Sequence, residues 1–421
     1  MKKLHLTEDW SATIVGLGGI AAVTGIFALF HWTPAAAVFQ WKDGNDALNI
    51  LSGINLVNMG IFFVLSYLML FVAQRLQGKP FAHTLGFPVI FLLAMLASFI
   101  GGYRPVNDIG IETVIFSLLI GLIIHHFFGL PEWLRNGLSS ELFIKIGLVF
   151  LGASILFQSL LKSGVLGLIQ SVVVVFAVWY FSFWLCRRCR IDKELSVMMS
   201  SAVSICGVSA AIASAGAIKG DPKKLSYVVS LVLVVAVPMI ILMPFLAVLL
   251  GLNEVVAGAW IGGTIDTTGA VVATGALYGQ EALETATIVK FSQNVLLGIA
   301  AFLIALFWNI AGKGQTPPDV EKTGWRVIWE RFPKFVLGFI LVSLIFSFFF
   351  ADAGYKPVND SLKKIQHLWF TLGFVSIGLE TDFKSLFNRG NTKAGLVFIG
   401  AQIFNIAFTL LIARLVFGVE W

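Results

Sequence analysis

The stretches SICGVSAAIAS (residues 204–214) and GGTIDTTGAVVATG (residues 262–275) interrupt a strongly apolar chain with small and hydroxyl residues. Backbone that is not helical survives inside a bilayer only where protein buries it or where it lines a watery cavity. In transporters such interruptions hold the cargo, because the ends of broken helices expose backbone groups there. The two stretches therefore predict the working centre of a membrane protein.

The composition excludes an ordinary soluble domain. Hydrophobic residues make up 58% of the 421 residues and charged residues 12%, and the mean hydropathy is +0.89. Soluble domains carry about 25% charged residues. The formal net charge of +6 needs no nucleic-acid partner, because cytoplasmic loops of membrane proteins are enriched in Lys and Arg.

We predict an all-α polytopic membrane protein with about 11–13 transmembrane elements, because apolar runs of about 20 residues recur along the chain. These runs lie near residues 12–31, 48–74, 86–101, 110–130, 141–160, 165–186, 225–250, 286–311, 334–351, 365–383 and 393–418. The polar segments 195–217 and 254–278 either cross fully or re-enter. We favour two broken or re-entrant helices that approach from opposite faces and meet near the midplane.

The domain organisation that we predict has two parts. Residues 1–85 hold two additional N-terminal transmembrane helices, and residues 86–421 form a transporter core with a cytoplasmic linker near 312–333. Loop Lys and Arg residues favour a cytoplasmic N-terminus. The excess of Lys and Arg on the cytoplasmic side is larger if the two polar segments re-enter, because the loop that carries Lys219, Lys223 and Lys224 then lies on that side.

Two internal likenesses predict an inverted repeat. Residues 146–155 (IGLVFLGASI) resemble residues 372–379 (LGFVSIGL), and the two helices run in opposite directions across the membrane in either span count. Residues 102–108 (GYRPVND) also resemble residues 354–360 (GYKPVND), as two equivalent turns outside the membrane. Inverted repeats are the architecture of many alternating-access transporters.

The first polar segment is a candidate anion site formed by Ser204, Cys206, Gly207 and Ser209. Helices that end at Gly207 expose N–H groups with partial positive charge, and these groups can hold a dehydrated anion together with Ser hydroxyls. The alternative is that small residues merely let two helices pack closely.

The second polar segment places Asp266 among Gly263, Thr264, Thr267 and Thr268. We expect the glycine and the threonines to join the substrate site. A carboxylate at membrane depth costs several kcal/mol and is a candidate functional residue. Three roles stay open for Asp266: coupling to a proton or cation, capping of the following helix, or a water-exposed position without a role.

Lys290, Gln293 and Asn294 share one face of the next apolar helix, because they are spaced at i, i+3 and i+4. Lys290 either snorkels to the membrane surface or carries a charge that pairs with Asp266 or attracts an anion. We predict an ion-coupling group of Asp266, Lys290, Gln293 and Asn294.

Enzyme motifs are absent from the sequence. It contains no GxSxG, no GxxxxGK[ST] phosphate loop and no Rossmann glycine pattern. We therefore expect neither an enzyme nor an ATP-driven pump, and no cofactor. Cys186, Cys189 and Cys206 make no disulfide framework or zinc site, and no histidine spacing suggests a metal.

Several motifs carry a family resemblance: residues 204–207 (SICG) with 209–211 (SAA), 258–263 (GAWIGG) with 265–266 (ID), 286–290 (ATIVK) and 335–339 (FVLGF). Over residues 87–417 the chain resembles the UPF0324 membrane proteins, which are often labelled sulfate exporters. The resemblance implies a prokaryotic inner-membrane secondary transporter with an anion as cargo. Many members have His at the place of Asp266 and Arg near Gln293, so the acid here favours proton or sodium coupling.

The leading functional hypothesis is secondary transport of a small anion, sulfate or a related oxyanion or organic anion, by alternating access. One alternative is a cation/proton antiporter that uses Asp266, and a channel ranks third. A membrane scaffold without transport is the alternative from another class. We expect a multi-pass protein of the prokaryotic inner membrane whose partners are the lipid bilayer, the anion and H⁺ or Na⁺, and a homodimer stays open.

Overall fold

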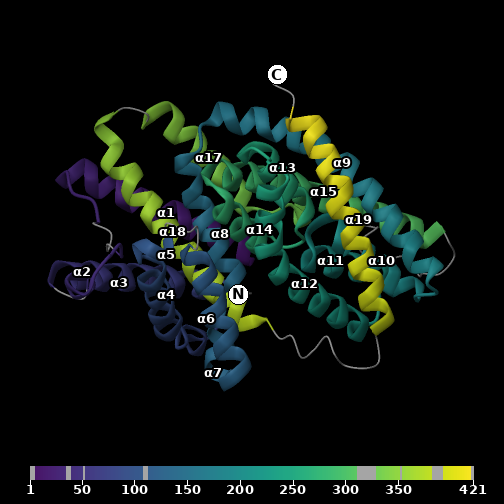
Figure 1. Cartoon of the computed structure of the whole chain (residues 1–421), viewed down its shortest axis with the longest axis horizontal. Coiled ribbons are helices and arrows are strands. Elements are labelled where there is room, and N and C mark those ends of the chain that lie inside the picture. The colour runs from purple at the N-terminus through teal and green to yellow at the C-terminus, as the bar shows by residue number, and fades with distance from the viewer. Residues whose placement is uncertain are drawn as a thin grey trace. The chain divides into compact units, whose positions relative to one another are not determined.

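A computed structural model of the chain describes residues 5–34, 39–50, 53–107, 112–310, 329–350, 353–381 and 392–418. These residues are helical apart from connecting segments and one isolated bridge between Trp41 and Tyr103. The chain forms two compact units: residues 1–160 with 334–381, and residues 161–333 with 382–421. Figure 1 shows the helices with the labels used below.

The helices confirm a polytopic membrane protein. Among the described residues, eight helices are long and apolar enough to cross a membrane: Glu8–Phe30, Gly53–Leu76, Phe81–Gly101, Glu132–Ser154, Phe157–Arg188, Pro222–Leu249, Gln280–Trp308 and Thr392–Phe417. Four shorter apolar helices are Thr113–Phe128, Val208–Ile218, Thr268–Tyr278 and Phe335–Phe349. The predicted division at residue 85 is not the division between the units, because the N-terminal helices belong to the first unit along with later ones.

The first unit contains α1 (Glu8–Phe30), α2 (Gly44–Ile50), α3 (Gly53–Leu76), η1 (Phe81–Thr84), α4 (Phe87–Gly101), α5 (Arg104–Asn107), α6 (Thr113–Phe128), α7 (Glu132–Gly137), α8 (Ser140–Leu151), η2 (Gly152–Ser154), α17 (Phe335–Phe349), η4 (Ala353–Tyr355) and α18 (Lys356–Glu380). A charged cluster joins α1 to α8. Lys145 Nζ lies 2.7 Å from Glu8 Oε1, 2.9 Å from Asp9 Oδ1 and 3.0 Å from Glu141 Oε2.

The helices that carry the predicted repeat, α8 and α18, pack antiparallel within the first unit. Ser140, at the start of α8, donates its N–H to Glu380 at the end of α18. A Cβ on Gly147 would touch the ring of Phe370, and a Cβ on Gly373 would touch the side chain of Ile144. Gly147 and Gly373 are equivalent in the likeness, and Ile144 and Phe370 stand at the same offset, two residues before its start. The two contacts are therefore equivalent under the proposed repeat.

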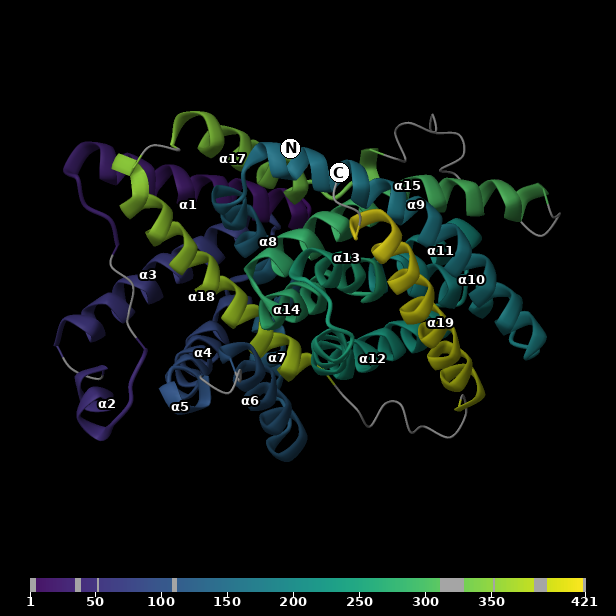
Figure 2. The same ribbon diagram turned by 45° about the horizontal axis from the view of Figure 1, so that its top comes forward.

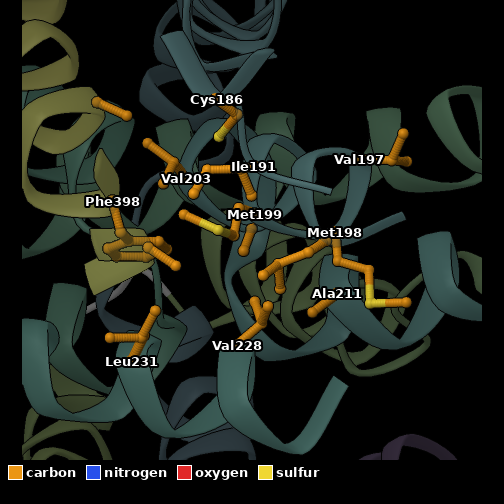
Figure 3. Packing of buried hydrophobic residues seen from close by; sticks show 14 of the residues in the cluster. Cys186, Ile191, Val197, Met198, Met199, Val203, Ala211, Val228, Leu231 and Phe398 are labelled. Carbon is orange, nitrogen blue, oxygen red and sulfur yellow. The ribbon is translucent and has the colours of Figure 1, made fainter. Parts of the chain in front are cut away.

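The second unit holds the predicted site. Its helices are α9 (Phe157–Arg188), α10 (Lys193–Ser201), η3 (Ala202–Cys206), α11 (Val208–Ile218), α12 (Pro222–Leu249), α13 (Glu254–Thr264), α14 (Thr268–Tyr278), α15 (Gln280–Ile310) and α19 (Thr392–Phe417). Figure 3 shows how apolar side chains from α9, α10, α12 and α19, such as Cys186, Met199, Val228 and Phe398, pack together around the first polar segment.

The first polar segment folds as a helical hairpin of α10 and α11, which lie side by side in Figures 1 and 2. Its open end lies at the start of α12. Lys224 in the first turn of α12 donates to Asp192 Oδ2 at 2.6 Å and to Glu194 Oε2 at 3.0 Å, at the start of α10. The chain therefore enters and leaves this hairpin at the same place.

The second polar segment forms a hairpin of α13 and α14. Glu254 Oε2, at the start of α13, accepts the N–H of Glu281 at 2.8 Å, and the Tyr278 hydroxyl donates to the carbonyl of Leu252. The 28 residues of α12 span about 42 Å between the open end of the first hairpin and that of the second. The two hairpins thus open at opposite ends of α12.

The structure corrects two of the predicted span boundaries. The break predicted between the runs 141–160 and 165–186 is helical, because α9 runs unbroken from Phe157 to Arg188 and the turn lies at η2 and the extended Ile155. The predicted turn at residues 354–360 is η4 and the first turn of α18, which begins with Lys356 and Pro357, a position where proline suits a helix. Residue 108 and most of the linker near 312–333 lie outside the described residues.

Candidate functional site

The tips of the two hairpins meet. The first tip is η3, a π-helical turn that ends at Gly207 with φ +53°, a backbone conformation that favours glycine. A Cβ on Gly207 would lie 3.2 Å from Asp266 Cβ and 2.6 Å from Val232 Cγ1. Glycine is therefore required both by the backbone angle and by the close approach of the second tip.

The second tip is the non-helical segment between α13 and α14. Ile265 is extended, and Thr267 is the N-cap of α14, whose Oγ1 accepts the N–H of Ala270 at 3.3 Å. Thr267 therefore fills the capping role that the sequence left open for Asp266. The Asp266 carboxyl is also buried, with 1% of the residue exposed, so it is not a water-exposed residue.

Six carbonyl groups at the C-terminal ends of η3 and α13 converge at the tips. Such groups have no partner within their own helix and carry partial negative charge. They are the carbonyls of Val203, Ser204, Ile205, Gly263, Thr264 and Ile265, and each accepts a hydrogen bond from a side chain of α15 or α19.

Lys290 and Gln293 supply these bonds from α15. Lys290 Nζ donates to Ile205 O at 2.7 Å, to Ile265 O at 2.8 Å and to Gln293 Oε1 at 2.9 Å. Gln293 Nε2 donates to Gly263 O at 2.9 Å and to Ser204 O at 3.4 Å. Lys290 is 1% exposed, so it does not snorkel, and its positive charge bridges both helix ends.

Gln402 and Asn405 supply the remaining bonds from α19, and sequence reasoning missed both. Asn405 Nδ2 lies 3.1 Å from both Val203 O and Thr264 O, and Gln402 Nε2 lies 3.0 Å from Thr264 O. Thr409 orients Asn405 by donating to its Oδ1 at 2.8 Å. The available signal was the spacing of three polar residues at i, i+3 and i+7, on one face of an apolar helix.

Asp266 stands apart from this network. Neither of its carboxylate oxygens has a hydrogen-bond partner, although Lys290 is close enough to act on it electrostatically. The hydroxyl of Thr264 and the amide oxygen of Asn294 are also buried without a partner. The amide oxygens of Gln170 and Gln402, which also lie at the second tip, are likewise without a hydrogen-bond partner.

The N-terminal ends of α11 and α14 are more accessible than the C-terminal ends of η3 and α13. Ser209 is exposed, and Thr267 and Thr268 are half-buried. Asn294 Nδ2 donates to Thr268 Oγ1 at 3.4 Å. Two positive helix ends thus lie near a buried carboxyl group that accepts no hydrogen bond.

Other predicted site residues are buried inside the tips. Ser204 Oγ donates to the Ser200 carbonyl at 2.7 Å in its own helix, Cys206 is 8% exposed, and Gly263 packs against the side chains of Gln170 and Thr409. The structure therefore brings all the predicted residues to one place but leaves Ser209, Thr267 and Thr268 as the accessible ones.

The second hairpin is fixed against α15 by close backbone contact. A Cβ on Gly258 would lie 2.6 Å from Ala282 O, and a Cβ on Gly262 would lie 2.9 Å from Ala286 Cα. Small residues allow such an approach between helices in membranes. This packing sets the height of Lys290 and Gln293 relative to the tip of the hairpin.

A charged group holds the open end of the first hairpin. Partial burial disfavours the ionised form of the Asp192 carboxyl. Hydrogen bonds from Lys224 and from the N–H of Leu195 stabilise that form by more than burial disfavours it. The pKa of the Asp192 carboxyl therefore lies below its ordinary value. Asp192 also caps α10, so one carboxylate stabilises both the start of that helix and its contact with α12.

The fold and the site define a multi-pass helical membrane protein with two interrupted hairpins that meet tip to tip. The sequence pattern of the family described as Conserved hypothetical protein 698 matches residues 85–397. The chain belongs to this family, the UPF0324 membrane proteins.

Relatives come from several bacteria. A UPF0324 membrane protein of Rhodopirellula baltica is 39% identical, over 93% of this chain and 74% of its own length. One from Nitratidesulfovibrio vulgaris is 35% identical over 89% of this chain and 66% of its own length. One from Nitrosomonas europaea is 32% identical over 99% and 95%. No solved structure matches the chain. This is thus a bacterial multi-pass membrane protein.

Proposed function

We propose that the chain is a secondary active transporter of a small anion, with its cargo bound at the hairpin tips. The observation that carries this proposal is the asymmetry of the tips. Six carbonyl groups at the ends of η3 and α13 accept hydrogen bonds from side chains, whereas the first residues of α11 and α14 are accessible. Helix N-termini with their free N–H groups are natural binding sites for anions.

The arrangement of the hairpins supports alternating access. Two hairpins that open at opposite ends of α12 and meet at their tips suit re-entrant elements from opposite faces of a membrane, with the tips near the midplane. The equivalent contacts of Gly147 and Gly373 support the inverted repeat in the other unit. Sulfate, a related oxyanion or an organic anion is the cargo class that we propose.

Transport into proteoliposomes tests the proposal. We expect uptake of labelled sulfate, or competition by another oxyanion or carboxylate, driven by an ion gradient. Ser209→Ala and Thr268→Val should raise the concentration for half-maximal uptake about ten-fold, the effect of one hydrogen bond to a charged group. Ser230→Ala is the matched control, because Ser230 bonds only to Ser226 O within α12. Unchanged uptake in both site variants would refute the proposed site.

A cation/proton antiporter is the second candidate, and the unpartnered carboxylate of Asp266 favours it. In anion-free liposomes a sodium gradient would then drive proton flux, and Asp266→Asn would abolish that flux. If instead Asp266→Asn alters the pH dependence of anion uptake while anion binding survives, Asp266 couples the anion transporter. A scaffold without transport would show neither flux.

A further inference from the structure

The hairpin tips form a cradle suited to a cation, and the chain itself fills it. We propose that the Lys290 ammonium is a tethered cation in this cradle, and that Asp266 therefore exchanges a proton instead of binding a metal ion such as sodium. The second part rests on the proposed coupling role of Asp266. The first part rests on the contacts of Lys290 alone.

The cradle is built from backbone oxygens. Ile205 O and Ile265 O come from the ends of two different helices and meet at one nitrogen, Lys290 Nζ, at 2.7 and 2.8 Å, with Gln293 Oε1 at 2.9 Å. An ammonium has three N–H donors, and all three are used. Helix C-termini carry partial negative charge, so the position attracts any cation of suitable size.

A metal ion at the tips would have to bind side-chain oxygens beside the Lys290 ammonium. The oxygens there that have no partner belong to the side chains of Asp266, Thr264, Asn294, Gln170 and Gln402. Hard cations gather about six oxygen ligands, yet the carbonyls nearest the cradle already accept donors. Ser204 O and Gly263 O accept the amide of Gln293, and Thr264 O accepts the amides of Gln402 and Asn405. A metal ion that approached Asp266 would also meet the positive charge of Lys290.

A proton fits the surroundings of Asp266. The carboxylate has 1% of its residue exposed and accepts no hydrogen bond, so its ionised form is costly. Protonation removes the charge without requiring any further ligand. The same argument predicts that the protein is more stable when Asp266 is protonated, that is, at lower pH.

The charged and titratable groups around Asp266 are few. Lys290 interacts electrostatically with Asp266, and Cys206 of η3 interacts electrostatically with Lys290. Apart from Tyr180 of α9, which is exposed, the helices packed around the tips carry their other titratable groups near their ends, and α11 carries none. These groups are Lys162, Cys186, Arg187 and Arg188 on α9, Lys193 and Glu194 on α10, Lys223, Lys224 and Tyr227 on α12, Glu254 on α13, Tyr278 on α14, Glu281 and Glu284 on α15, and Lys393 and Arg414 on α19. A pH effect that Asp266→Asn removes therefore belongs to the tips.

Thermal unfolding of the purified full chain in detergent tests the tethered cation. We expect NaCl and KCl to shift the wild-type midpoint no more than choline chloride at equal ionic strength. Lys290→Ala empties the cradle, so NaCl or KCl should raise its midpoint by about 2 °C or more over choline. A folded Lys290→Ala protein without such a shift would overturn the tethered cation.

Lys290→Ala could fail to fold. Two further measurements, on wild type and on Asp266→Asn, test the proposal without it. Wild type should lose stability relative to Asp266→Asn as the pH rises, and should bind no radioactive sodium. Sodium binding or sodium-specific stabilisation of wild type that Asp266→Asn removes would overturn the proposal. These measurements need no flux, so they can fail while anion transport is confirmed, or succeed while it is not.

Discussion

Gln293 forms hydrogen bonds with three buried partners at the tips, Lys290 Nζ, Gly263 O and Ser204 O. Gln293→Leu leaves Gly263 O and one Lys290 N–H buried without a partner, since these bonds are 2.9 Å long and lie inside the tips. A buried group without its partner costs about 1–3 kcal/mol. We expect Gln293→Leu to lower the free energy of unfolding by at least that amount, measured by denaturant titration in detergent.

The matched control for this substitution is Gln366→Leu. Gln366 of α18 is fully buried, but neither its amide nitrogen nor its amide oxygen has a hydrogen-bond partner. The same change of side chain there should leave the free energy of unfolding unchanged or raise it. Equal losses in the two variants would show that the bonds of Gln293 contribute little.

Single residues were predictable where the membrane made them conspicuous. Asp266 and Lys290 stood out because charges in apolar helices are costly, and both lie at the tips. The capping role of Thr267 and the carbonyl bonds of Lys290 were not predictable, because they depend on where helices from distant parts of the chain end. Gln402 and Asn405 were missed for the same reason.

The contact between α13 and α15 depends on glycine. A Cβ on Gly262 would lie 2.9 Å from Ala286 Cα, so Gly262→Ala forces the helices apart and should cost about 1–3 kcal/mol of stability. Gly18→Ala in α1 is the control, because an added Cβ there meets nothing within 4 Å and alanine favours a helix. A drop in the unfolding midpoint only for Gly262→Ala is the expected result.

The start of α10 depends on a carboxylate whose pKa lies below its ordinary value. Such a group contributes stability above its unfolded pKa of about 3.9, and loses this contribution as the pH falls through the folded pKa. Asp192→Asn keeps a good N-cap but removes the charge. We therefore expect it to lower the unfolding midpoint at pH 7, with a difference from wild type that disappears in strong acid.

Glu194→Gln provides the comparison for Asp192→Asn. Glu194 accepts a 3.0 Å hydrogen bond from Lys224 but does not cap α10, so its replacement should cost less at pH 7. A loss from Asp192→Asn that persists at the lowest pH would mean that the effect comes from something other than the charge.

The helical type could be predicted from hydropathy, because crossing a bilayer imposes length and apolarity. The number was not, because the described residues contain eight helices long enough to span a membrane and four shorter apolar ones, against the predicted 11–13 transmembrane elements. Helix boundaries were predicted less accurately where polar residues extend a helix beyond its apolar run, as at the starts of α9 (Phe157) and α18 (Lys356). The two compact units could not be predicted at all. Each combines segments far apart in the sequence, and an apolar surface does not specify which partner covers it.

The sidedness of the hairpins is a property of the whole molecule, and it decides between full crossing and re-entry. Lys223 lies at the open end of the first hairpin and Glu281 at that of the second, and both are exposed. With re-entrant hairpins and a cytoplasmic N-terminus, Lys223 faces the cytoplasm and Glu281 the outside. If both segments cross fully, both residues lie outside.

Cysteine labelling separates these arrangements. In a background without Cys186, Cys189 and Cys206, we expect a membrane-impermeant maleimide to label Glu281→Cys in intact cells and Lys223→Cys only in inverted vesicles. Labelling after permeabilisation controls for reactivity. Both sites labelled from outside would mean full crossing, and the reversed pattern would place the N-terminus outside. Labelling from opposite sides would support re-entry, because the tips meet between two ends that α12 holds about 42 Å apart.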